Sequence, residues 1–161
     1  MRLSGKRLLL LAADGVDLDD YETLRKAFEL EDAVIFVTAP SKYEAVETIL
    51  EGKRCDDLQI DIPIEAIDPQ QFEGVIIPGG QDSVDSLRRN REALNLIRAF
   101  HEQSKVILAS SQAGELLRNS GVLSRQIMVR ENESVYDFVN HAVNVLLEPP
   151  FRLYTGYRST I

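Results

Sequence analysis

The chain has 161 residues and a mass of 18.1 kDa, a size typical of one domain, and we expect a single domain over residues 1–161. Hydrophobic residues make up 44% and charged residues 27%, which excludes a disordered chain. The 18 Lys and Arg residues against 26 Asp and Glu residues give a net charge of −8, so we expect no nucleic-acid partner. The lone cysteine, Cys55, excludes an intrachain disulfide and a paired-thiolate metal site, and is typical of a cytoplasmic protein.

The N-terminal apolar run, residues 7–13, is predicted to be a buried strand. It is far shorter than the ~20 apolar residues that span a membrane, and acidic residues follow at once, so we expect neither a signal segment nor membrane insertion. Apolar residues at helical spacing predict a helix over 19–30, and a β-rich run predicts a strand over 33–37. The chain thus opens as a strand–helix–strand unit.

The segment that follows is ambiguous. Residues 41–52 fit a helix, with Ser41 and Glu44 as its capping pair, and fit a strand nearly as well. Apolar residues alternate over 58–64, which predicts a strand with one solvated face, and Pro63 suggests that this strand lies at a sheet edge.

Strands and helices alternate through the second half of the chain. The predicted elements are a strand at 75–77, a helix at 90–103, a strand at 106–109, a helix at 112–119, a short helix starting at Ser134, and weak strands at 143–147 and 151–155. Such alternation predicts an α/β fold, a three-layer α/β/α sandwich with a mainly parallel, flavodoxin-like sheet.

In such folds ligands bind beyond the carboxyl ends of the strands. Ser111 follows one predicted strand and opens a helix, where backbone N–H groups and the helix dipole favour developing negative charge. With Ala109 and Ala113 it forms a loosened version of the G-x-S-x-G nucleophile turn of hydrolases. The alternative is an ordinary helix-capping serine.

Two other strand ends carry candidates with two interpretations each. Gly79 and Gly80 form either a tight turn or a pair of oxyanion donors. Asp17 is either a helix cap or a site acid. The sequence places neither histidine, His101 or His141, beside these residues.

Together these segments resemble the ThiJ/PfpI superfamily, which has the class I glutamine amidotransferase-like fold. The matching segments are 6–13, 17–20, 72–80, 87–90, 105–117 and 119–123. The resemblance implies intracellular peptidase, amidase, glyoxalase, deglycase or chaperone-like relatives, a homodimer and no cofactor. It also implies that the family's closing C-terminal helix is absent after Ile161.

The family's usual site is a Cys followed by His and Gly, with a Glu after the first strand and, in many members, a further His. By this resemblance the Cys, His and Gly positions hold Ser111, Gln112 and Ala113, the Glu position holds Asp17, and the further His falls near Arg130. Gly79 and Gly80 remain as oxyanion donors, joined by the amide of Gln112.

These replacements leave three hypotheses. A serine has no thiolate and needs a base, Gln112 cannot take a proton, and an ordinary Asp17 is a poor base. The first hypothesis is therefore a protein silent for the family's cysteine chemistry, which binds a small polar ligand or serves as a dimeric scaffold. The second is a serine hydrolase or amidase with Ser111 as nucleophile, and the third is a subunit that binds a partner through the shortened C-terminus.

Overall fold

The computed structural model describes residues 1–40, 44–119, 127–131 and 133–147, without the side chains of Ser111 and Asn119. Its core is a five-stranded parallel sheet in the order β3-β1-β6-β7-β8. The strands are β1 (Arg7–Leu11), β3 (Val34–Thr38), β6 (Gly74–Ile77), β7 (Val106–Ser110) and β8 (Ile127–Arg130). The strand order reverses direction between β1 and β6, and this is where doubly wound sheets open a crevice for ligands.

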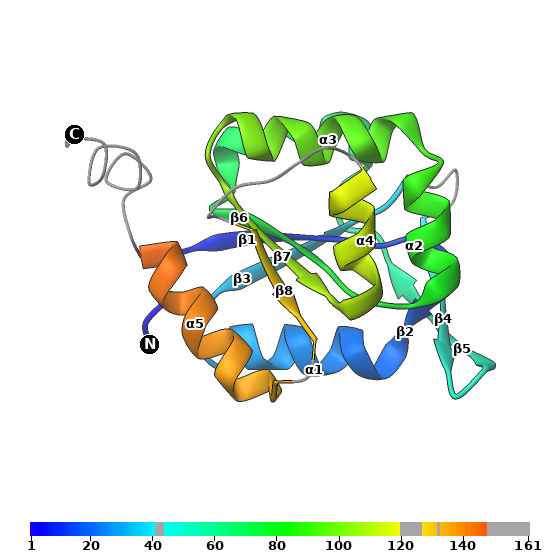
Figure 1. Cartoon of the computed structure of the whole chain (residues 1–161), viewed down its shortest axis with the longest axis horizontal. Coiled ribbons are helices and arrows are strands. Elements are labelled where there is room, and N and C mark those ends of the chain that lie inside the picture. The colour runs from blue at the N-terminus through cyan, green and yellow to red at the C-terminus, as the bar shows by residue number, and fades with distance from the viewer. Residues whose placement is uncertain (41–43, 120–126, 132, 148–161) are drawn as a thin grey trace.

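Helices cover both faces of this sheet (Figure 1). One layer holds α2 (Gln81–Arg88), α3 (Arg91–Glu102) and α4 (Ser111–Asn119), and the other holds α1 (Leu18–Glu29) and α5 (Val135–Leu147). Two buried apolar clusters, one on each face of the sheet, join it to the two helix layers. Strand β1 is buried on both faces, because Leu8, Leu9 and Leu10 are all fully buried. The predicted three-layer α/β/α sandwich is confirmed.

A small second sheet stands beside the main one. It consists of β2 (Val16–Asp17), β4 (Ala45–Leu50) and β5 (Lys53–Gln59), with β4 parallel to β2 and antiparallel to β5. The ambiguous segment is therefore a strand over 45–50, while Ser41 lies outside the described residues. Cys55, the lone cysteine, lies in β5.

The predicted strand over 58–64 is wrong beyond its second residue. β5 ends at Gln59, and the amide of Ile62 donates to the carbonyl of Val37. Pro63 has no N–H to continue a ladder, and Ile64 begins the 3₁₀ turn η1 (Ile64–Ala66), followed by η2 (Pro69–Gln71). The apolar side chains here reach the core from irregular backbone.

The end of the chain also differs from expectation. Residues 143–147, predicted as a strand, form the last part of α5, because the buried residues of this helix recur at three- and four-residue spacing. Those residues are Phe138, Val139, Ala142, Val143 and Leu146. The weak strand at 151–155 and the predicted loss of a closing helix both lie outside the described residues. Within the described ranges, no helix is both long and apolar enough to cross a membrane.

Candidate functional site

A polar pocket of about 310 Å³ opens at the carboxyl ends of the strands, between the first turns of α1 and the start of α5. Its lining residues are Asp17, Asp19, Asp20, Thr23, Gln112, Arg130 and Val135. Three residues that the sequence singled out, Asp17, Gln112 and Arg130, therefore meet in one pocket.

Ser111 lies where the sequence predicts it, at the corner between a strand and a helix. β7 ends at Ser110, and Ser111 is the first residue of α4. Its side chain is outside the described part of the structure, so its environment and reactivity stay predictions. Ala113, two residues on, is fully buried against the sheet, which is consistent with the requirement for a small residue at such a corner.

The glycine turn after β6 is held by side chains of the same chain. The amide of Gly79 donates to Asp20 Oδ2 at 2.7 Å, and the amide of Gly80 donates to Gln112 Oε1 at 3.0 Å. Gly80 has a φ of 118°, and a Cβ atom there would lie 2.6 Å from the carbonyl oxygen of Gly15. Only glycine fits this turn, and both predicted oxyanion donors already have an acceptor.

Asp17 is the N-cap of α1. Its carboxylate accepts a hydrogen bond from the Asp20 amide at 3.2 Å, and its own amide donates to the carbonyl of Gly79 at 3.0 Å. The capping interpretation of Asp17 is confirmed, although this residue also lines the pocket.

Sequence analysis did not single out Asp20 as a site residue, although its carboxylate joins two other parts of the site. Besides the Gly79 amide, its carboxylate binds Arg130 Nη1 at 3.1 Å. The side chains of Asp20 and Arg130 are 14% and 26% exposed, so their ion pair is shielded more than a surface pair. The available signal was the acidic segment 17–20, which has Asp at 17, 19 and 20 and in which residues three apart share one helix face.

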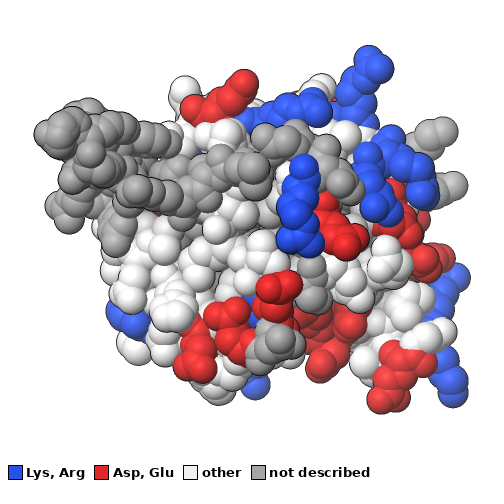
Figure 2. Space-filling view, viewed as in Figure 1, with Lys and Arg blue, Asp and Glu red and all other residues white. Residues whose placement is uncertain are grey.

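Arg130 provides the positive charge of the pocket. It ends β8, where it stands in register with Ser110, and its Nε donates to the carbonyl of Glu133 at 3.3 Å. With three aspartates in the lining, the pocket has more negative than positive groups. Figure 2 shows the same excess on the surface, where acidic side chains gather over α1 and the start of α5.

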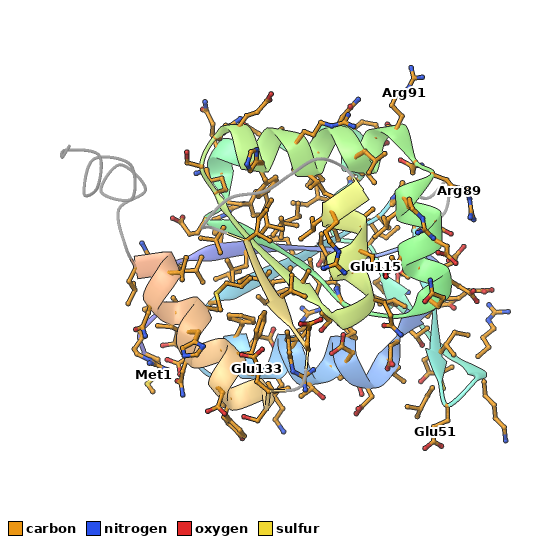
Figure 3. The ribbon with its side chains drawn as sticks, viewed as in Figure 1. Met1, Glu51, Arg89, Arg91, Glu115 and Glu133 are labelled. Atoms are coloured by element: carbon orange, nitrogen blue, oxygen red, sulfur yellow. The ribbon has the colours of Figure 1, made fainter. Side chains whose placement is uncertain are left out.

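The remaining polar candidates lie elsewhere. His101 is on α3 and His141 on α5, and neither lines the pocket. In the described ranges no group of three or more His, Cys, Asp or Glu side chains is arranged to hold a metal ion. Arg89 and Arg91 point outward from the junction of α2 and α3 (Figure 3), on the side of the sheet opposite α1 and α5.

The chain matches the model of the DJ-1/PfpI family over residues 6–143. It belongs to this family. A deglycase of Pyrococcus abyssi is 25% identical over 117 residues, covering 73% of this chain and 67% of the relative. Catalase HPII of Mycobacterium avium is 26% identical over 123 residues, which cover 76% of this chain but only 17% of that much longer protein. Among solved structures, oxidized DJ-1 of Toxoplasma gondii superimposes with a TM-score of 0.77 at 15% identity, covering 96% of this chain and 98% of that one.

Proposed function

We propose that this chain is a divergent DJ-1/PfpI protein that is silent for the family's cysteine chemistry and binds a small polar ligand in the pocket between α1 and α5. The observation that carries this proposal is that both backbone amides of the glycine turn already donate hydrogen bonds to side chains of the same chain. Asp20 and Gln112 accept the hydrogen bonds of Gly79 and Gly80. An oxyanion would have to displace both side chains before these amides could stabilise it.

The two side chains that accept hydrogen bonds from this turn are also not suitable bases. Gln112 has no proton-accepting nitrogen, and the carboxylate of Asp20 is engaged by an amide and by Arg130. A serine nucleophile needs a hydrogen-bonded base to lose its proton. The same pocket nevertheless offers carboxylate, amide, hydroxyl and guanidinium groups, which suit the recognition of a polar molecule.

The second candidate, a serine hydrolase or amidase, is favoured by the position of Ser111 at the start of α4. A fluorophosphonate probe separates the two. We expect no labelling of the wild type, and none of Ser111→Ala or of a control variant, Ser86→Ala on α2. Labelling that Ser111→Ala abolishes and Ser86→Ala retains would contradict catalytic silence.

The intact scaffold is tested by restoring the family's residues. A Ser111→Cys, Gln112→His variant supplies a thiol and a base and releases the Gly80 amide from its side-chain acceptor. We expect glyoxalase turnover of methylglyoxal from this variant and none from the wild type. Turnover by the wild type would contradict the proposal.

We also propose that the protein is a homodimer in the cytoplasm, as the family resemblance implies. Light scattering should then give twice the chain mass of 18.1 kDa. A mass of one chain at micromolar concentration would contradict the dimeric part of the proposal.

A further inference from the structure

A second hollow, here called the apolar groove, adjoins the polar pocket and runs between α1 and α5 with a volume of about 260 Å³. Its apolar lining residues are Ala27, Leu30, Val135 and Tyr136. Leu30 is 58% exposed and Tyr136 is 72% exposed, so large apolar side chains from both helices face solvent at one hollow. Single exposed apolar side chains are normal, whereas grouped ones mark interaction sites.

The outer face of α5 is also poor in charge. The 13 residues of this helix include one Asp and one His, and no Lys, Arg or Glu. Its exposed positions include Tyr136, Asn140, Asn144 and Leu147. Figure 2 shows this part of the surface as an area of uncharged side chains. The solvent face of a helix usually carries charged residues, and the centre of a protein interface is depleted of them and enriched in Tyr.

The shape of the apolar groove fits a helix. Its lining residues on α1 recur at three- and four-residue spacing from Asp19 to Leu30, so they share one face of that helix. The 11 residue steps between these two positions cover about 17 Å at ~1.5 Å each. An apolar strip of this length between two helices accommodates about three turns of a third helix, which is a common mode of peptide recognition.

The charges around the groove favour a basic partner. Asp19 and Glu22 line it against a single cation, Lys26. Glu133 and Asp137 add two acids where α5 begins, and Figure 2 shows acidic side chains gathered in this region. Basic side chains would be attracted to this border, whereas a symmetric contact between two copies of the chain would bring two acidic borders together.

We infer that the apolar groove binds an amphipathic helix of another protein, about three turns long, with basic side chains beside its apolar face. The apolar face covers Leu30 and Tyr136, and the basic side chains lie against Glu22 and Asp137. This inference goes beyond the proposed function, because the surface lies beside the ligand pocket and needs no chemistry at Ser111.

Synthetic helices test the chemistry of the partner. Three labelled peptides of about 12 residues are titrated into the full chain by fluorescence anisotropy. The first has leucines on one helix face and lysines elsewhere, the second has glutamate in place of every lysine, and the third has the residues of the first arranged without an apolar face. We expect the first to bind about 10-fold or more tightly than the others, and more weakly as salt is raised. Equal binding of either control, or no binding of the first peptide, would overturn the inference.

Apolar variants locate the peptide on the surface. Leu30→Ala and Tyr136→Ala each shorten a side chain that is more than half exposed, so the urea midpoint should not move. Each should weaken binding of the lysine peptide about 10-fold, because a partner would bury most of that side chain. Leu50→Ala is the matched control, since Leu50 is 39% exposed on β4, and it should leave the affinity unchanged. Unchanged affinity in both groove variants, or an equal loss in Leu50→Ala, would overturn the assignment.

Charge variants test the acidic border. Glu22→Gln should weaken binding of the lysine peptide about 2- to 5-fold. Glu115→Gln is the matched control, because Glu115 is exposed on α4 in the other helix layer (Figure 3), and it should leave the affinity unchanged. Equal effects of the two substitutions would show that the peptide responds to net charge alone, which would overturn the inference.

Light scattering separates a partner helix from a second copy of the chain. Leu30→Ala and Tyr136→Ala should keep the mass of the wild type. A fall from twice the chain mass to 18.1 kDa in these variants would show that the groove is the dimer surface and would overturn the inference. Labelling of Ser111 by the fluorophosphonate probe would contradict catalytic silence alone, so the two proposals fail separately.

Discussion

Replacing Asp20 by alanine is the most direct test of the contacts that hold the site together. The substitution removes the acceptor of the Gly79 amide and the partner of Arg130 at once. A hydrogen bond from an amide to a carboxylate contributes about 1.5–3 kcal/mol. The ion pair is 14% and 26% exposed, so we assign it about 1 kcal/mol, at the upper end for surface pairs and well below the 3–5 kcal/mol lost on breaking a fully buried pair.

Alanine is the better helix former by about 0.5 kcal/mol, which offsets part of this loss. The free energy of unfolding should therefore fall by about 2–3.5 kcal/mol in Asp20→Ala. Asp20→Asn retains an oxygen for the Gly79 amide but loses the charge, and should fall by about half as much.

Urea denaturation measures these differences as shifts of the midpoint at constant slope. Glu22→Ala is the matched control, because Glu22 is exposed on the same helix, and it should stay within about 0.5 kcal/mol of the wild type. If Asp20→Ala matched this control, the carboxylate would not hold the glycine turn, and the main support for catalytic silence would be lost with it.

Three further predictions concern single residues. Gly80→Ala should cost at least about 2 kcal/mol in urea unfolding, because its φ of 118° and the 2.6 Å approach of Gly15 oppose a side chain. Asp17→Ala should lower the unfolding temperature by about 2–4 °C through loss of about 1 kcal/mol of helix capping. Side-chain hydrogen bonds from Arg2 hold the pKa of Glu31 below its ordinary value in the folded protein. The stability that the ionised Glu31 adds is therefore fully present above the ordinary pKa, and it is lost as the pH falls through the lowered pKa of the folded state. NMR titration should show a lowered pKa for Glu31 in the wild type and a higher pKa in Arg2→Ala. The same Glu31 pKa in both proteins would contradict this prediction.

The fold was predictable where one pattern dominated. The buried run that became β1 and the helical spacing of α1 and α3 each had a single interpretation. The failures occurred where local pattern and tertiary packing disagree. Isoleucines at alternating positions after Gln59 indicated a strand, yet backbone bonds to Val37 and the missing N–H of Pro63 end it. α2 was missed because its eight residues include only two large apolar side chains, Val84 and Leu87.

The site was predictable in position but not in its contacts. Strand ends and the paired glycines located it, because parallel strands bring their carboxyl ends to one edge. Which acid would reach Gly79 depended on the angle at which α1 leaves β2. Capping favours Asp17 at the helix entrance, and the next turn then carries Asp20 over the glycine amide. No pattern in the sequence predicts the angle between β2 and α1.

Ser110, the residue just before the strand–helix corner, carries a buried hydroxyl. Sequence analysis favours Ser111, because a residue at such a corner presents its side chain to a ligand. Ser110 follows the predicted strand over 106–109 and has no interpretation of its own there, yet its buried oxygen has no hydrogen-bond partner among the described residues, as is also true of Thr38 Oγ1. If the chain is silent in catalysis, selection for nucleophilicity at residue 111 is absent, while an unpaired hydroxyl at residue 110 still costs stability. Replacing Ser110 by alanine removes this buried hydroxyl, so the free energy of unfolding should stay equal or rise, and a clear fall of the urea midpoint would contradict the reasoning.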